Sequence, residues 1–470
     1  MITHIKIDGF KSFQDFEMTF TPFTVIAGVN ASGKSNLFDA FNLLSRLAET
    51  DLKMAFSEQR GNPDELFTQF DDGSYADEME FTVELLLNRK VKDNWGAEVE
   101  LNSTRLRYNL KIGRSNNSNG FQSLKVKYES LEKIKPEEDI WAKELIPKNS
   151  KLLWKTLRAG GSREPFIRTE MEGETIAIKI RQDGGGHGKA TPASAVSQTV
   201  LGGINSVDFP HAFAAKEEMR SWRFLQLNPE DLREPTRQDA GLRDEITSTG
   251  KNLAAALFRI KQNDPYTLKE ISRKLNSFLP GFTDVDVFDD KENRQYIIKL
   301  KGEDKKWFSS RVLSEGTLRF LTLCILEYDE KFTGLLCFEE PENGIHPFRI
   351  KATAQLLKDL SSSFEDVDNL LRQVIVNTHS NILITSMVSW QNDLHVSVWL
   401  SRQNTLLKEI NGKKEKLKVT RVSPVIKKSE KGKQLVFQFN NEYERNLNLN
   451  EVEKYLMNTE TEEAVKNLQK

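Results

Sequence analysis

Residues 28–35 carry the side chains with the clearest chemistry in this sequence. They read Gly-Val-Asn-Ala-Ser-Gly-Lys-Ser, a complete G-x-x-x-x-G-K-[ST] phosphate loop. In such a loop, successive backbone N–H groups surround a β-phosphate, the lysine reaches the β and γ oxygens, and the final hydroxyl binds Mg²⁺. We therefore predict an ATP site in which Lys34 is catalytic and Ser35 is a metal ligand. The residues expected to contact the nucleotide here are Gly28, Asn30, Ser32, Gly33, Lys34, Ser35 and Asn36.

The segments on both sides of this loop have the periodicity that its function requires. Residues 23–27 form an apolar run typical of a buried strand, and residues 36–48 repeat apolar side chains at helical spacing. A second glycine-rich segment, residues 183–190, also ends in Gly-Lys, but it has Asp183 at the first glycine position and Ala190 at the Mg²⁺ position. We interpret that second segment as a flexible turn.

Two later apolar strands end in polar clusters. Residues 335–338 are followed by Glu339 and Glu340, and residues 373–376 lead into His379. A buried strand that ends in two carboxylates can place one beside the metal and the other beside the attacking water. We expect Glu339 to hold the metal-bound water and Glu340 to be the general base. His379 can donate a hydrogen bond to the γ-phosphate.

Two predicted helix starts carry polar residues. Ser314 and Gly316 begin a helix, where free N–H groups bind anions, so these residues could hold a γ-phosphate from a second subunit. Glu342 has two interpretations, as a metal ligand or as the first acidic residue of the next helix. The helix start is favoured, because a negative charge suits a helix N-terminus.

Together these motifs resemble the ABC-type ATPase head shared by structural-maintenance-of-chromosomes (SMC) proteins, RecF and the OLD (overcoming lysogenization defect) family. The resemblance covers roughly residues 1–90 and 220–400. It is greatest to the OLD-type ATPases of bacterial anti-phage systems, such as the ATPase subunits of PARIS or Septu. The segments that carry it are Gly-Phe-Lys-Ser-Phe at 9–13, the phosphate loop continuing into Asn36, the Leu-Ser-Glu-Gly-Thr run at 313–317, the Glu-Glu-Pro-Glu-x-x-Ile-His-Pro run at 339–347 and Thr-His-Ser at 378–380.

The resemblance implies a head-to-head dimer with two ATPs sandwiched between the heads. Ser314 and Gly316 would then act on the nucleotide of the partner, Asn343 and His346 would lie on the dimer-contacting loop, and His379 would be the switch histidine. Lys11 resembles a basic residue on the phosphate side of these heads, and this interpretation is only slightly favoured over a surface turn.

The sequence also departs from the common ABC pattern. Glu315 and Thr317 replace the usual glycine and glutamine of the signature, and Glu339 replaces aspartate. The longer Glu339 side chain is expected to slow Mg²⁺-dependent hydrolysis. The glutamine loop has two candidate residues, Gln69 and Gln226, and the sequence does not decide between them.

The pattern of elements predicts an α/β fold, namely an ABC-type P-loop ATPase head. It would have a mainly parallel sheet, an antiparallel β-subdomain and an inserted β-rich and helical subdomain. In the insert, residues 106–112 and 176–180 alternate like strands, and residues 130–145 read as a charged helical piece interrupted by proline. The expected divisions are an N-terminal lobe (1–90), the insert (91–215), a C-terminal lobe (216–400) and a final segment (401–470) made of a basic β part and an acidic helix.

Composition is that of an ordinary globular protein. Charged residues make up 29% and apolar residues 38% of the 470, and the formal net charge is −2, so no overall field draws the chain to nucleic acid or membrane. Residues 408–433 hold ten lysines or arginines against three glutamates, which is usually a solvated face. Cys324 and Cys337 lie in apolar runs and are expected to be free core residues. No secretory or membrane-spanning pattern is present, so a cytoplasmic location is predicted.

Three functions fit these features. In the first, the chain is an ATPase subunit of an anti-phage complex and acts with a separately encoded effector, which the resemblance implies is a nuclease. The Toprim nuclease of OLD enzymes needs an Asp-x-Asp motif, and residues 380–470 contain only one aspartate, Asp393. The second is a RecF-like DNA repair ATPase, and under this hypothesis DNA is a possible partner. The third is a nucleotide-locked scaffold that hydrolyses little ATP.

Overall fold

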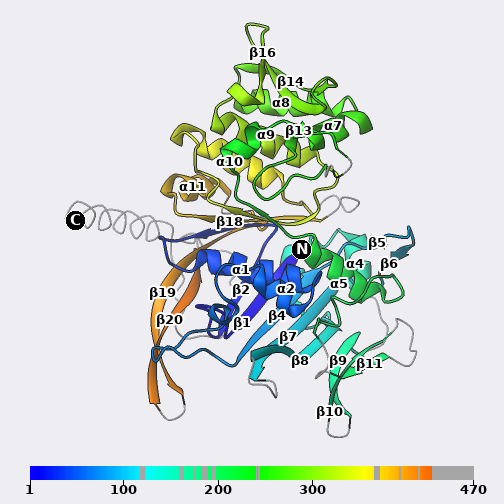
Figure 1. The fold of residues 1–470 in the computed structure, drawn as a ribbon, viewed down its shortest axis with the longest axis vertical. Helices are drawn as coiled ribbons and strands as arrows, with labels where there is room; N and C mark the ends of the chain where they lie inside the picture. Colours follow the sequence, from blue (N-terminus) through cyan, green and yellow to red (C-terminus); the bar gives the residue numbers. More distant parts are fainter. Residues whose placement is uncertain are drawn as a thin grey trace, which may run out of the picture.

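The computed structural model describes residues 1–425 except 117–121, 158–163, 173–174, 182–188, 193–196, 240, 242–243, 365–370, 391–392 and 411–412. The predicted acidic helix after residue 440 and most of the second glycine-rich segment lie outside these residues. The described chain is layered, with a wide antiparallel sheet at one end, a central sheet in the middle and a helical lobe at the other end (Figure 1).

The central sheet has six strands, and five of them are parallel. Its order is β12 (Arg223–Leu225), β17 (Gly334–Glu339), β18 (Arg372–Thr378), β3 (Phe23–Ala27), β19 (Val396–Ile410) and β20 (Lys413–Pro424), with only β20 antiparallel to its neighbour. The carboxyl ends of β12, β17, β18 and β3 therefore meet at one edge, which is where open α/β sheets bind ligands.

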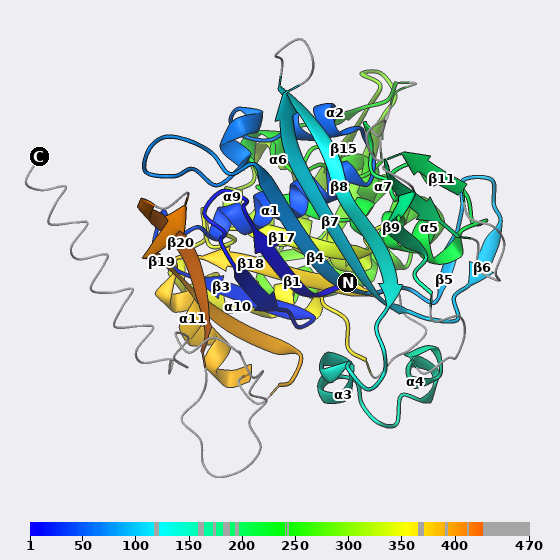
Figure 2. The same ribbon diagram turned by 90° about the horizontal axis from the view of Figure 1, so that it is seen from below.

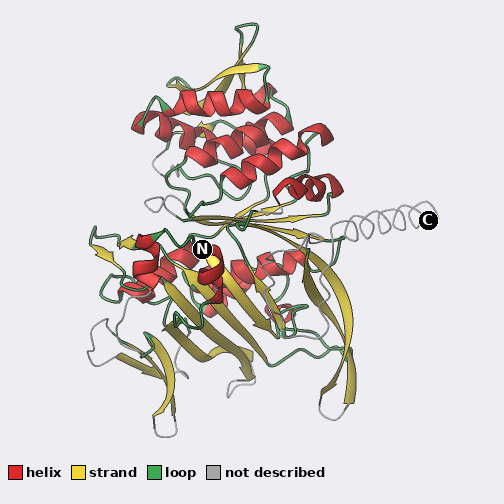
Figure 3. Cartoon of the chain, turned by 180° about the vertical axis from the view of Figure 1, so that it is seen from behind, coloured by secondary structure: helices red, strands yellow, loops and turns green. Residues whose placement is uncertain are grey.

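Both faces of this sheet are buried, which explains its continuous apolar strands. Leu335 and Cys337 of β17 pack into one core, and Leu336 and Phe338 into the other. The first core lies between the central and antiparallel sheets and contains α1 (Lys34–Leu47), so the helix after the phosphate loop is fixed on two sides. Helices of this middle layer are visible between the sheets in Figure 3.

The antiparallel sheet has eight strands and forms the broad surface seen in Figure 2. Strands β7 and β8, from the segment read as an insert, continue the sheet of β1 and β4, so no break in hydrogen bonding separates them. The order is β11 (Lys189–Pro192), β10 (Thr175–Ile180), β9 (Ile167–Glu172), β8 (Gln122–Lys133), β7 (Arg105–Asn116), β4 (Glu78–Leu86), β1 (Ile2–Asp8) and β2 (Phe16–Thr19).

The remaining elements surround these two sheets. Near the antiparallel sheet lie α2 (Leu52–Ser57), η1 (Pro63–Leu66), α3 (Ile140–Leu145), α4 (Lys151–Leu157), α5 (Pro210–Arg220) and the hairpin of β5 (Lys90–Lys92) with β6 (Glu98–Glu100). The helical lobe contains α6 (Pro229–Arg233), α7 (Leu253–Asn263), α8 (Thr267–Phe278), η3 (Ser310–Val312), α9 (Glu315–Tyr328), α10 (Pro347–Asp359), α11 (Asn381–Ser386) and η4 (Met387–Trp390). A small sheet of β13 (Thr236–Arg237), β15 (Gln295–Gly302), β14 (Phe282–Asp290) and β16 (Trp307–Ser309) covers that lobe.

This arrangement confirms the predicted fold class, with one local error. Residues 130–133, read as part of a charged helical piece, are the end of β8, and a helix forms only at Ile140–Leu145. Pairing with β7 decides the conformation there, since a strand with one solvated face can carry charged side chains. Both cysteines are free and buried, as expected. Among the described helices, none is both long and apolar enough to cross a membrane.

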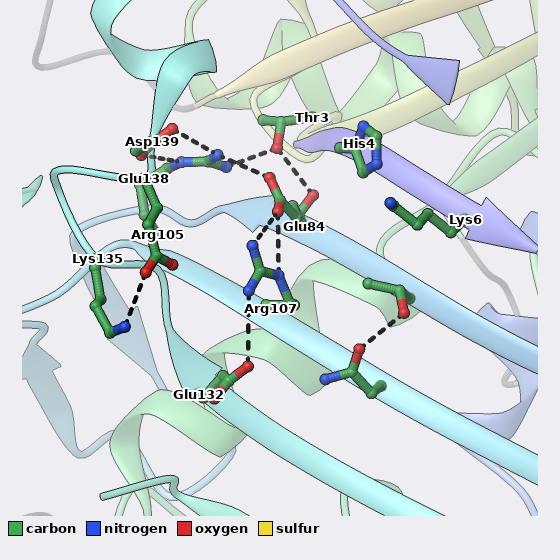
Figure 4. Close-up of polar contacts among 12 residues, drawn as sticks. Thr3, His4, Lys6, Glu84, Arg105, Arg107, Glu132, Lys135, Glu138 and Asp139 are labelled. Carbon is green, nitrogen blue, oxygen red and sulfur yellow. Dashed lines mark hydrogen bonds and ion pairs between the residues drawn. The ribbon is translucent and has the colours of Figure 1, made fainter. Parts of the chain in front are cut away.

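A buried arginine joins β1, β4, β7 and α3 (Figure 4). The Arg105 guanidinium, on a residue 1% exposed, donates to both carboxylate oxygens of Asp139, at 2.8 and 3.0 Å. It also donates to the Thr3 hydroxyl at 2.6 Å and to a Glu84 oxygen at 3.4 Å. Its neighbour Arg107 reaches Glu84 from the half-exposed side at 2.8 Å.

The carboxyl group of Glu129 in β8 is fully buried and receives three hydrogen bonds. Its oxygens accept from the Tyr108 hydroxyl at 3.0 Å and from the backbone N–H groups of Val200 and Leu201 at 2.7 and 2.8 Å. Burial raises the pKa of Glu129 from 4.5 to about 7, although these donors act to lower it. The folded state thus keeps a proton that the unfolded state releases. The resulting stability is complete below pH 4.5 and is lost as the pH rises to about 7.

Replacing Glu129 with glutamine should therefore flatten the pH dependence of stability. At 1.36 kcal/mol per pKa unit, titration of Glu129 lowers the free energy of unfolding by up to about 3 kcal/mol between pH 4.5 and pH 8. The amide of glutamine does not titrate, so this loss is absent from the variant. Thermal unfolding of both proteins at pH 5 and pH 8 measures the difference. Glu132→Gln, on the same strand but half-exposed, is the matched control. Equal pH slopes for wild type and Glu129→Gln would contradict the assignment.

Candidate nucleotide-binding site

The phosphate loop runs from the end of β3 to the start of α1. Gly33, the N-cap of α1, has φ 90°, and Ala31 has φ 60°, so the chain turns sharply twice before the helix. The helix N-terminus has no side-chain cap, which leaves its N–H groups available to an anion. The Lys34 ammonium folds over the loop and donates to the carbonyl oxygens of Gly28 and Val29 at 2.7 and 2.8 Å.

Lys34 faces the acidic cluster that follows β17. The residue is only 7% exposed, and burial lowers the pKa of its ammonium. The charges of Glu340, Glu342 and Glu339 act to raise that pKa, in this order of size. The fold thus brings the phosphate loop and the Glu339-Glu340 motif together across two strands. An ammonium opposite three carboxylates suits a site that binds Mg²⁺ with a polyphosphate.

Asn377 holds the two glutamates at the end of β17. Its amide donates to Glu339 Oε1 at 3.2 Å, while its side-chain oxygen accepts from the backbone N–H of Glu340 at 3.2 Å. Glu340 itself has φ 46°, a left-handed conformation that is rare and costly for glutamate. Such strain is typical of functional sites. Sequence reasoning assigned no role to Asn377, although it lies in the same polar cluster as His379.

The side chain of Glu340 is positioned by two polar neighbours. Its Oε1 lies 3.1 Å from His379 Nδ1, and its Oε2 accepts from the Asn343 amide at 2.8 Å. A carboxylate held on both oxygens has a fixed orientation, which a general base requires. The structure thus places His379 and Asn343 beside the predicted base.

The preferred interpretation of Glu342 is wrong. It lies in a turn, because α10 begins only at Pro347 with His346 as its N-cap. Its side chain points inward at 8% exposure and accepts from the Thr378 hydroxyl at 2.5 Å and from the His379 N–H at 3.3 Å. Glu342 therefore connects the loop after β17 to the end of β18. Pro347 is the residue that sets the helix start, since proline suits the first helical turn.

Gln226 lies at the site edge and Gln69 does not. Gln226 follows β12, whose Leu225 is opposite Phe338, so it sits beside Glu339 in the register. Both line a cleft of about 840 Å³ that also contains Asp39 and Arg60. Gln69 forms only an isolated bridge with Tyr75. Of the two candidates, Gln226 lines the cleft that contains Glu339, and Gln69 does not.

A charged cluster on α1 was not found from the sequence. Asp39 accepts from Lys11 at 2.7 Å and from Arg60 at 2.9 Å. Lys11 has φ 46° and is held by this ion pair rather than lying free on a surface turn. The three residues are far apart in sequence, and no periodicity links Arg60 to the phosphate loop.

The other residues predicted to bind the nucleotide differ in their exposure and contacts. Asn36 donates from its amide to the Ser12 hydroxyl at 2.7 Å, Ser32 is buried at 2% exposure, and Ser35 is half-buried. Asn30 is exposed at the tip of the loop. Ser35 and Glu339 offer a hydroxyl and a carboxylate oxygen, hard donors of the kind that Mg²⁺ takes together with substrate phosphates. These residues fit a Mg²⁺ ion.

Ser314 and Gly316 belong to the helical lobe. The Ser314 hydroxyl caps α9 by accepting from the Thr317 N–H at 3.2 Å, and a Cβ on Gly316 would lie 3.3 Å from the carbonyl oxygen of Gly344. In the described part of the chain, neither residue has a hydrogen bond to residues 28–36. Their described contacts are with Thr317 and with Gly344.

Comparisons with known proteins agree with an ATPase site. A family model described as "AAA ATPase domain" matches residues 1–158, and one described as "AAA domain, putative AbiEii toxin, Type IV TA system" matches residues 186–385. The first contains the phosphate loop, and the second contains Glu340 and His379. No curated protein matches the chain significantly.

Solved SMC heads align with most of the chain. An SMC head bound to the C-winged helix domain of ScpA has 13% identity and a TM-score of 0.49, covering 90% of this chain and 97% of that one. The SMC head domain from Thermotoga maritima has 12% identity and a TM-score of 0.36, covering 90% of this chain and 98% of that one. The Smc head domain with a coiled coil and joint from Pyrococcus yayanosii has 11% identity and a TM-score of 0.43, covering 98% of this chain and 99% of that one. Since these TM-scores are below 0.5, the fold is assigned from the strand order and the phosphate loop. Two models of AAA ATPase domains thus match separate parts of the chain, and the described strands and helices form an α/β P-loop ATPase fold.

Proposed function

We propose that the chain hydrolyses ATP slowly as a head-to-head dimer and thereby regulates a separate effector. The observation that carries this proposal is the convergence of Lys34, Glu340 and His379 at one edge of the central sheet. Three separate segments, at residues 28–36, 339–343 and 377–379, meet only there. Each has the chemistry that phosphoryl transfer needs at that point.

Each residue has a distinct role in this proposal. Glu340 takes the proton from the attacking water, and His379 and Asn343 keep its carboxylate in position. Lys34 neutralises negative charge that develops on the β and γ oxygens. Mg²⁺, held by Ser35 and Glu339, would neutralise phosphate charge when bound. Gln226, beside Glu339, is our choice for the glutamine loop.

The position of Ser314 supports a composite site made by two chains. Its helix α9 has an N-terminus suited to an anion, and we assign this N-terminus to the phosphate loop of a second copy of the chain. The turn with Asn343 and Gly344 packs against the Ser314-to-Gly316 segment, through Glu315 and Gly316. A second copy would therefore meet Ser314 and the loop holding the base on one surface.

Dimerisation has a direct test. The Glu340→Gln protein with ATP and Mg²⁺ should sediment as a dimer, and adding Ser314→Arg should return it to a monomer. At protein concentrations low enough to keep both proteins monomeric, nucleotide affinity should stay within about 2-fold, because a bulky cation at α9 obstructs the partner and not the chain's own loop. Ser277→Arg, an exposed serine of α8, is the control. Dimers that persist in the Ser314→Arg protein would exclude the composite site.

We further propose that the effector acts in anti-phage defence and is a nuclease. The resemblance to OLD-type ATPases supports this, and one matching family model is described as a putative toxin of a type IV TA system. Hydrolysis that is unchanged by DNA, together with a stable complex with a nuclease encoded next to this chain, is the expected result. DNA-stimulated hydrolysis without such a complex would instead support the RecF-like function.

A further inference from the structure

The phosphate loop is supported by a hairpin nearly four hundred residues away in sequence. Strand β19 runs parallel to β3, with Leu400 opposite Ala27, so Ser401 follows beside Gly28. The Ser401 hydroxyl donates to the carbonyl oxygen of Ser32 at 2.9 Å. A Cβ on Gly28 would lie 2.7 Å from the Ser401 carbonyl oxygen, so these two segments of the backbone are in close contact.

Thr420 of β20 makes the central contact of this support. Its hydroxyl lies 2.7 Å from the Ser12 hydroxyl and donates to the Ser32 carbonyl at 3.4 Å, and its backbone N–H donates to the Ser12 carbonyl at 2.9 Å. Ser12 in turn accepts from the Asn36 amide at 2.7 Å. The hydroxyls of Ser12 and Thr420, which come from distant segments, are thus hydrogen-bonded to Asn36 and to Ser32, at the two ends of this part of the loop.

Thr420 also occupies the space beside Gly33. A Cβ placed on Gly33 would lie 1.8 Å from Thr420 Oγ1, so only glycine fits at this point. The contact is fully enclosed, with Ser32 2% and Ser401 and Thr420 each 1% exposed. Loss of the buried Thr420 hydroxyl would take one hydrogen-bond partner from the Ser12 hydroxyl and one from the Ser32 carbonyl, which would keep the Ser401 hydroxyl.

We propose that Thr420 is a positioning residue of the nucleotide site. Its hydroxyl fixes the Ser32–Gly33 peptide and, through Ser12, the side chain of Asn36. The loop N–H groups are thereby held in the direction that a bound phosphate needs, which lowers the cost of ordering them on binding. This inference rests on the proposed function, since it assigns Thr420 to the same ATP site.

Thr420→Val, which keeps the shape and removes the hydroxyl, tests this. The Kd for MgATP, measured by calorimetry, should rise about 5- to 20-fold with kcat changed less than about 2-fold. Thr420→Ser should restore the affinity to within about 2-fold of wild type. Thr405→Val, on the exposed far part of β19, should bind like wild type. Thermal unfolding without nucleotide should show that the valine and serine variants are both folded at the temperature of the binding measurement.

A second variant keeps the test decisive if Thr420→Val does not fold. Ser401→Ala removes the other hydroxyl on the Ser32 carbonyl and should weaken MgATP binding about 2- to 10-fold. Wild-type affinity in Thr420→Val or in Ser401→Ala would overturn the inference, and so would equal weakening in the serine and valine variants of Thr420. If wild-type protein binds no MgATP, the proposed function fails instead.

Discussion

Glu340→Gln is expected to bind ATP with an affinity within about 2-fold of wild type and to lose at least about 100-fold in kcat. The amide can still meet His379 and Asn343, so the left-handed turn at Glu340 should persist. It cannot accept the proton of the attacking water. Single-turnover hydrolysis and equilibrium binding of MgATP, measured on the same preparation, separate the two effects. Wild-type turnover in this variant would show that another group is the base.

Lys34→Ala is the matched contrast to that experiment. Removing the ammonium takes away the only positive side chain within residues 28–35, and ATP binding should fall by more than about 100-fold. A biological activity that survives Glu340→Gln but not Lys34→Ala would mean that bound ATP locks an assembly without needing hydrolysis. An activity lost in both variants would mean that turnover itself is required.

Arg105→Met is expected to destabilise the protein by about 3–5 kcal/mol. The substitution leaves the Asp139 carboxylate buried at 5% exposure without its bidentate partner, and it removes donors from Thr3 and Glu84. The guanidinium also lies 5.0 Å from the ring centre of Trp141, and this contact would be lost. Thermal unfolding and limited proteolysis would measure the loss, with cleavage expected first near α3.

Arg107→Met is the control, because Arg107 bonds the same Glu84 from a half-exposed position (Figure 4). Solvent screens that pair, so the expected cost is below about 1 kcal/mol. A similar loss of stability in the two variants would mean that the buried position of Arg105 does not strengthen its ion pairs. It would also mean that Arg105 does not hold α3 against the sheet.

The local chemistry of the site could be predicted from sequence because each motif includes its own structural context. The strand at residues 23–27 was placed at the bounds observed for β3, and the helix starting after Ser314 is capped by that residue. Apolar runs buried on both faces give a strong pattern over few residues. The end of each run then identifies the residue at the sheet edge, which is why Glu339 and His379 were found.

Contacts that depend on register between distant strands could not be predicted in this way. Gln226 beside Glu339, and Thr420 beside Gly33, follow from the pairing of strands more than one hundred residues apart. The error at residues 130–133 has the same origin, since cross-strand pairing with β7 overrides the local charge pattern. Glu342 was misplaced because an acidic residue near a proline fits a turn as well as a helix start.

The order of strands in the central sheet also sets an order of events during synthesis. Strand β3 lies between β18 and β19, and both are made more than three hundred residues after it. The antiparallel strands β1, β2, β4 and β7 can pair early, whereas β3 must wait for neighbours that close very long loops. The phosphate loop is therefore made long before the strands that flank β3, so ATP can bind only after β18 and β19 have been synthesised.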